Sequence, residues 1–235
     1  MIHSTILSNV EVIAFDADDT LFINEPYFEE AERKFCVLFE DYLSHQSLSK
    51  ILFNTQIDNL PIYGYGIKGY ILSMIEAAIK ITNGTGSTKM MSKILEIGKE
   101  LSRQPIVLLD GVEETLAQLH GKYKLVVATK GDLKDQQRKL HDSGLGNYFH
   151  HIEVMADKAE LNYEKLFNRL EVQSENFLMI GNSLKSDVLP VLNCGGWAIH
   201  VPFHTTWEHE RIDHEIVHNK FKSCKKISDI LPLLL

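Results

Sequence analysis

Apolar residues recur at two different spacings along the chain, and the spacing changes near residue 105. Between residues 22 and 105 they recur every three or four positions, which is the period of an amphipathic helix. Because this stretch has almost no strand signal, we expect an all-helical unit of four helices. The first predicted helix begins at Asn24-Glu25-Pro26 and runs to Leu43, and the others cover Ser47–Asn59, Lys68–Ile81 and Thr88–Ser102, with a break at Pro61–Gly66.

Elsewhere, short apolar runs alternate with helical segments. The predicted strands are Val12–Phe15, Tyr123–Ala128, His151–Met155, Asn176–Ile180 and Trp197–Val201. Strands that alternate with helices indicate an α/β fold with a doubly wound parallel sheet, Rossmann-like in architecture. We therefore expect residues 1–21 and 106–235 to form an α/β core, into which residues 22–105 are inserted. The amphipathic tail Ile227–Leu235 should pack back on the sheet.

The composition is that of an ordinary globular protein, with 44% hydrophobic and 24% charged residues in a chain of 235. A formal net charge of -8, without any basic run, argues against nucleic acid as a partner. The first residues lack a basic segment followed by a long apolar one, and no apolar run is long enough to span a membrane. Cys36, Cys194 and Cys224 are widely separated, which favours reduced thiols. We expect a cytoplasmic protein with no nucleic acid or membrane partner, and its oligomeric state stays open.

The first predicted strand ends in the acidic sequence DADDT, residues 16–20. Three carboxylates within four residues repel one another and raise each other's pKa, unless a cation or a proton used in a reaction relieves them. Because alternate side chains of an extended segment point the same way, Asp16 and Asp18 can face one site while Asp19 points elsewhere. Taken alone, the sequence also fits an acidic turn that caps the next helix.

Polar residues also follow the second and third predicted strands. Thr129 follows the second strand, where its hydroxyl and the next backbone N–H groups, that of Lys130 first, can bind phosphoryl oxygens near a helix N-terminus. Thr129 by itself also fits an ordinary helix N-cap. Lys158 follows the third strand, where it can neutralise phosphate charge and keep Asp16 ionised. Lys165 is a rival, but its predicted place inside a helix favours Lys158, for which a solvated surface lysine is the alternative.

The fourth predicted strand ends in GNSLKSD, residues 181–187. Gly181 allows the backbone to turn tightly. Asn182 and Asp187 offer oxygens to a hard cation such as Mg²⁺. On the alternative interpretation, Ser183 or Ser186 only caps the helix that follows. In parallel sheets, ligands bind beyond the carboxyl ends of the strands, and each of these polar sequences is predicted at such an end.

Taken in order, DADDT, Thr129, Lys158 and GNSLKSD resemble the four motifs of the haloacid dehalogenase-like (HAD) hydrolases. The resemblance implies that residues 22–105 are the family's helical cap and that the protein is a phosphatase of small phosphorylated metabolites. It implies that Asp16 attacks phosphorus and becomes an aspartyl phosphate, while Asp18 protonates the leaving oxygen and then activates water. The residues that would bind the substrate phosphate are Thr129, Lys130 and Lys158.

The resemblance also implies a site for Mg²⁺, which would offset charge during phosphoryl transfer. Its ligands would be Asp16, the backbone carbonyl of Asp18, Asn182 and Asp187. The chain departs from the family at Asn182, because the family usually has an acid directly after the glycine of the fourth motif. An amide oxygen carries only partial charge, so we expect weaker binding of Mg²⁺ than with a carboxylate.

Other functions stay open from the sequence. The same fold supports 2-haloacid dehalogenases, whose chemistry needs the nucleophile but has no phosphate leaving group to protonate, and Asp18 argues against it. The sequence barely distinguishes a phosphomutase from a phosphatase. Because Asn182 replaces the usual acid, a catalytically weak member of the family that binds phosphate also stays open. A signalling receiver domain is disfavoured by the large helical insert. The histidines from His200 to His218, with Trp207 among them, match no metal-ligand spacing, and we interpret that segment as surface or partner contact.

Overall fold

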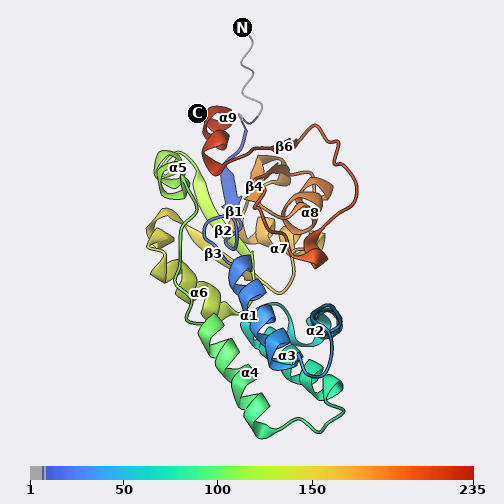
Figure 1. The fold of residues 1–235 in the computed structure, drawn as a ribbon. Helices are drawn as coiled ribbons and strands as arrows, with labels where there is room; N and C mark the ends of the chain where they lie inside the picture. The colour runs from blue at the N-terminus through green and yellow to red at the C-terminus, as the bar shows by residue number, and fades with distance from the viewer. Residues whose placement is uncertain (1–6, 8) are drawn as a thin grey trace. The chain divides into compact units, whose positions relative to one another are not determined.

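The computed structural model describes Leu7 and residues 9–235. The expectation that the first residues form no leader segment therefore lies largely outside the described residues. The chain divides into two compact units (Figure 1). One unit is an α/β core that contains the described residues up to Ile23, together with Ile106–Thr129 and Gln136–Leu235. The other is helical and contains Asn24–Pro105 together with Lys130–Asp135.

Within the described residues, six strands of the core form one sheet in the order β3-β2-β1-β4-β5-β6. The strands are β1 (Val12–Phe15), β2 (Lys124–Lys130), β3 (His151–Met155), β4 (Phe177–Gly181), β5 (Trp197–His200) and β6 (Phe221–Ser223). The pairs that β1 forms with β2 and with β4 are parallel, as are β4 with β5 and β5 with β6. Phe15 lies opposite Val127 on one side and Ile180 on the other, so the carboxyl ends of these strands lie together. The predicted doubly wound α/β sheet is confirmed.

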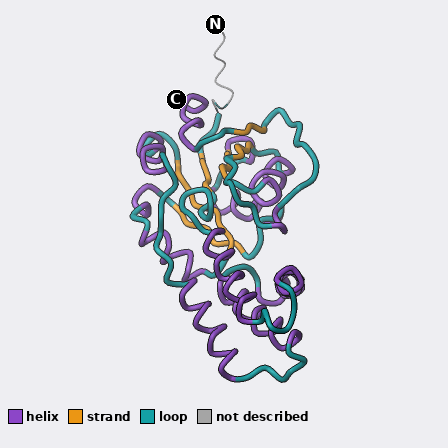
Figure 2. Tube along the Cα trace, in the orientation of Figure 1, coloured by secondary structure: helices purple, strands orange, loops and turns teal. Residues whose placement is uncertain are grey.

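Both faces of the sheet are covered, which explains why its strands read as continuous apolar runs rather than alternating ones (Figure 2). On one face, Ile13 and Phe15 pack with residues of α5 (Val112–Leu119) and α6 (Leu133–Asp142). On the other face, Val12 and Ala14 pack with residues of α7 (Glu160–Leu170) and α8 (Leu189–Asn193). The tail packs as predicted, because Ile227, Ile230 and Leu234, of the last turn and α9 (Leu231–Leu234), are buried in the first of these clusters.

The helical unit consists of α1 (Glu25–Leu38), α2 (His45–Tyr63), α3 (Ile67–Ile81) and α4 (Thr88–Leu101). Its core is formed by the periodic apolar positions of the sequence, among them Phe35, Phe39, Leu52, Met74 and Ile94. This agrees with the interpretation of those positions as bundle core.

The structure differs from the sequence analysis in three local features. Pro61 does not break α2, which runs on to Tyr63 and ends at Gly64, where the φ of 73° favours glycine. The predicted helix after GNSLKSD begins as a π-helical turn over Leu184–Val188 before α8. β6 was not predicted, because three residues are too few to show a strand period. No helix in the described part of the chain is long and apolar enough to cross a membrane.

Candidate active site

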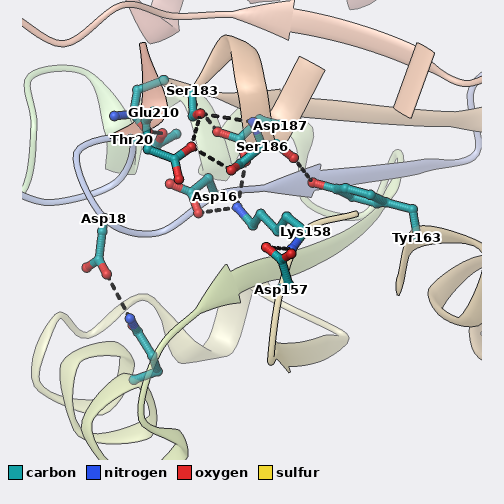
Figure 3. Close-up of polar contacts among 12 residues, drawn as sticks. Asp16, Asp18, Thr20, Asp157, Lys158, Tyr163, Ser183, Ser186, Asp187 and Glu210 are labelled. Atoms are coloured by element: carbon teal, nitrogen blue, oxygen red, sulfur yellow. Dashed lines mark hydrogen bonds and ion pairs between the residues drawn. The ribbon is translucent and has the colours of Figure 1, made fainter. Parts of the chain in front are cut away.

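The site is centred on Asp16, the first residue after β1 (Figure 3). Its backbone N–H donates to the carbonyl oxygen of Ile180 at 2.9 Å, which ties the end of β1 to β4. Its Oδ1 accepts a hydrogen bond from Nζ of Lys158, which follows β3. The same Nζ donates to Oδ1 of Asp187 at 2.6 Å. The fold therefore brings together three of the predicted site residues, each at most 7% exposed.

Burial and charge set the ionisation of this cluster. Burial raises the pKa of Asp16 to about 7, with Lys158 opposing the rise and the carboxylates of Asp187 and Asp18 adding to it. Burial alone would lower the pKa of Lys158, but the carboxylates of Asp16 and Asp187 outweigh it and raise that pKa above its ordinary value. Lys158 therefore stays protonated near neutral pH, and the ionised form of Asp16 depends on this nearby cation.

The turn after β4 carries Asn182 and Asp187 into the site. A Cβ on Gly181 would lie 2.2 Å from Oδ2 of Asp187, so only glycine fits at the start of the turn. The backbone N–H of Ser183 donates to this Oδ2 at 2.9 Å, and the N–H of Asp187 donates back to the carbonyl oxygen of Ser183 at 2.9 Å. Both oxygens of Asp187 are thus engaged, one with Lys158 and one with the turn itself.

The side-chain amide of Asn182 faces a group of oxygen atoms. One amide atom lies 3.2 Å from Oδ2 of Asp16, 3.2 Å from the backbone carbonyl oxygen of Asp18 and 3.3 Å from Oγ1 of Thr20. With its nitrogen turned inward, the amide donates to these oxygens. With its oxygen inward, the amide accepts from the Thr20 hydroxyl but meets two further acceptors, on Asp16 and Asp18, and a cation between these oxygens would relieve that contact.

This donor set fits Mg²⁺. No group of three or more His, Cys, Asp or Glu side chains in the described residues is arranged to hold a metal. The candidate ligands are instead a carboxylate oxygen of Asp16, the backbone carbonyl of Asp18 and the amide oxygen of Asn182. Mg²⁺ is usually held by one or two carboxylates and completes its shell with water and substrate phosphate, so such a mixed oxygen set suits it.

The carboxylate of Asp18 points away from Asp16, toward α6 (Figure 3). Its Oδ1 accepts from Nζ of Lys139 at 2.6 Å, and its Oδ2 accepts from Nε2 of Gln136 at 2.7 Å. Both partners are buried, at 6% and 2% exposure. The sequence analysis missed Gln136 and Lys139, because polar residues three positions apart on a helix most often face solvent.

Thr129 and Lys130, which were expected just after the second strand and are its last two residues, have different surroundings. Thr129 is 1% exposed and lies beside the end of β1, because Phe15 pairs with Val127 two residues earlier. Lys130 clusters with the helical unit, where its ammonium lies 4.0 Å from the centroid of the Tyr65 ring. Lys165, the rival of Lys158, is exposed on α7.

A buried carboxylate bound to a lysine thus lies at the carboxyl edge of a doubly wound sheet, the edge at which α/β proteins bind their ligands. The family model for haloacid dehalogenase-like hydrolases matches residues 10–195, and the chain belongs to this family. The protein is therefore a HAD-like hydrolase.

Named proteins and solved structures are also similar to this chain. N-acylneuraminate-9-phosphatase from Mus musculus is 24% identical over 200 residues, which cover 80% of this chain and 81% of that protein. A haloacid dehalogenase-like family hydrolase from Xanthomonas campestris has a solved structure with a TM-score of 0.84 and 35% identity, covering 95% of this chain and 89% of that one. The HAD-hydrolase YfnB from Bacillus subtilis, solved bound to magnesium, has a TM-score of 0.62 and 20% identity, covering 96% and 98%. The likeness to YfnB shows the fold alone.

Proposed function

We propose that this hydrolase is a Mg²⁺-dependent phosphatase that acts on small phosphorylated metabolites through an aspartyl-phosphate intermediate. The observation that carries the proposal is the buried Asp16, held by Lys158 and facing a group of oxygens that suits a divalent cation. The phosphatase names of the curated relatives support this reaction over dehalogenation.

In the first step, an oxygen of Asp16 forms a bond to phosphorus while the bond from phosphorus to the ester oxygen breaks. Asp18 gives a proton to that leaving oxygen, and in the second step it takes a proton from the water that attacks the aspartyl phosphate. Because both oxygens of Asp18 now accept bonds from Lys139 and Gln136, the carboxylate must rotate away from α6 before it acts. Lys158 keeps Asp16 ionised, and with Thr129 and Lys130 it is proposed to bind the phosphoryl group.

Asp16, the Asp18 carbonyl and Asn182 would hold the Mg²⁺, with Asp187 as a fourth candidate that must first exchange one of its two present hydrogen bonds. When bound, the ion would neutralise charge on the phosphoryl oxygens. We further propose that the helical unit is the cap that selects the substrate.

The direct test is release of inorganic phosphate, with and without Mg²⁺, from a panel of phosphate esters. The panel includes N-acylneuraminate 9-phosphate, because relatives are named for it, and phosphoglycolate, after a structural neighbour's name. We expect release that requires Mg²⁺. Halide release from 2-chloropropionate without any phosphatase activity would contradict the proposal and favour the dehalogenase alternative.

Replacing Asn182 by aspartate should tighten binding of Mg²⁺ to the free enzyme by about 1–2 kcal/mol, because a full charge replaces a dipole. Without metal, the new carboxylate would face Oδ2 of Asp16 and the Asp18 carbonyl, so we expect a lower melting temperature that Mg²⁺ restores. Turnover should fall if the extra charge repels the phosphate. Calorimetry without substrate measures the affinity, and an unchanged value would show that Asn182 does not contact the metal.

Asp18→Asn should separate the two chemical steps when p-nitrophenyl phosphate is the substrate. Its leaving group needs no proton, so one equivalent of nitrophenolate should appear in a burst, followed by turnover roughly 10²–10⁴-fold slower than wild type. The slow phase reflects an aspartyl phosphate whose water is no longer activated. Rapid-quench measurement of labelled enzyme would detect this intermediate. Steady turnover at the wild-type rate would assign the acid/base role to another residue.

A further inference from the structure

The segment between β5 and β6 contains a carboxylate that reaches the turn after β4. This segment lies beyond the residues 10–195 matched by the family model, and it is rich in histidine. Glu210 ends a short 3-10 turn over Glu208–Glu210. Its carboxylate is directed at the turn that holds Asn182 and Asp187 (Figure 3).

Two serine hydroxyls converge on this one carboxylate. Oγ of Ser183 donates to Oε2 of Glu210 at 2.5 Å, and Oγ of Ser186 donates to the same oxygen at 2.5 Å. Ser183 and Ser186 are 7% and 6% exposed, so removing the carboxylate would take away the acceptor that these two O–H groups share in a largely buried place. Hydrogen bonds to an ionised acceptor are also stronger than those between neutral groups.

A second contact ties the same two segments together. Nζ of Lys185 donates to the backbone carbonyl of His209 at 2.8 Å. Lys185 lies between the two serines in sequence, so the segment around Glu210 contacts all three polar side chains of residues 183–186. This is a built contact between two loops of the core, not an accidental approach of one exposed side chain.

A chain of hydrogen bonds connects the two serines to the site residues. Oγ of Ser183 accepts from the backbone N–H of Ser186 at 3.0 Å, while the N–H of Ser183 donates to Oδ2 of Asp187. Asp187 in turn accepts from Lys158, which also contacts Asp16. The turn is π-helical, a conformation that is rare in proteins and frequent at functional sites.

We propose that Glu210 is a positioning residue, which fixes the turn after β4 through Ser183 and Ser186 and so holds Asn182 and Asp187 in place around Asp16. It need not touch the substrate or a metal. The part of this proposal that concerns turnover rests on the proposed phosphatase function, whereas the part that concerns the turn does not.

Hydrogen–deuterium exchange tests the effect on the turn directly. In Glu210→Ala, we expect exchange at the amides of Ser183, Ser186 and Asp187 to become about tenfold faster or more, because their local hydrogen bonds lose support. Glu210→Gln keeps an oxygen that both serines can reach and should exchange at a rate near wild type. Glu208→Ala, a neighbouring exposed acid, is the matched control and should leave these amides unchanged.

Steady-state kinetics test the consequence for the reaction. We expect Glu210→Ala to lower kcat about tenfold with KM changed no more than about twofold, because the loss concerns alignment and not substrate binding. Glu210→Gln should recover most of kcat. Combining Ser183→Ala and Ser186→Ala should reproduce the loss, and adding Glu210→Ala to that pair should cause no further loss.

Three outcomes would overturn the role of Glu210. They are unchanged exchange at the three amides, a uniform rise of exchange throughout the chain, and an unchanged kcat in Glu210→Ala. If the wild type releases phosphate from no ester, the proposed function fails, and exchange at these amides alone then decides whether Glu210 positions the turn.

Discussion

Replacing Asp16 by asparagine should lower hydrolysis of an aryl phosphate by at least roughly 10³-fold, because an amide cannot form the covalent intermediate that splits the displacement into two steps. The carboxylate is buried at the end of β1, bonded to Lys158, and is the one predicted nucleophile of the site. The rate is measured by phosphate release at saturating Mg²⁺, and no labelled enzyme should form. Activity close to wild type would remove Asp16 as nucleophile.

The same variant should change how stability depends on pH, which also shows whether it is folded. The pKa of Asp16 is about 7 in the folded protein against an ordinary value of 3.8, so the folded state binds the proton more tightly than the unfolded state. Between about pH 4 and pH 7, this group therefore makes wild-type stability fall as pH rises. Asparagine has no such proton. The stability of Asp16→Asn relative to wild type should rise across that window in urea unfolding without metal, and a constant difference would contradict the raised pKa.

The sequence could predict the sheet and the centre of the site because both depend on local order. Four apolar runs of strand length, each ending in polar residues, are enough to predict parallel strands whose carboxyl ends meet, and hence that Asp16 and Lys158 lie near one another. The choice of Lys158 over Lys165 also followed from local structure, since a residue just beyond a strand can face the site while one on the outer side of a helix cannot.

The residues that the sequence did not reveal act through contacts between distant segments. Lys139 and Gln136 meet Asp18 across more than a hundred residues, and Glu210 meets Ser183 across 27. Charged residues are common on helices and loops, and nothing in their own neighbourhood distinguishes one that turns inward from one that stays in solvent. At Pro61 the local signal was itself misleading. Proline usually breaks a helix, so a break was predicted there, but Pro61 lies within the last turn of α2.

Lys158→Met should be the most damaging substitution for stability. It removes the cation between Asp16 and Asp187 while leaving two buried carboxylates that face the same space. Breaking a buried ion pair by removing one partner costs about 3–5 kcal/mol, and we expect a loss of that size near neutral pH. The pKa of Lys158 is raised above its ordinary value, so its stabilising charge is fully present below that ordinary value and is lost only at more alkaline pH. Urea unfolding at pH 7 measures the loss.

The matched control is Lys165→Met, which removes an exposed lysine from α7 and should change stability by no more than about 0.5 kcal/mol.

A second variant separates the effect of the Lys158 charge from that of its packing. In Asp16→Asn combined with Lys158→Met, one of the two unpaired carboxylates is gone, so much of the lost stability should return. Turnover of Lys158→Met should fall roughly 10²–10³-fold, as when one donor to the developing charge is removed. A loss of stability that the second substitution does not relieve would mean that the space filled by the lysine stem, and not its charge, is what the core requires.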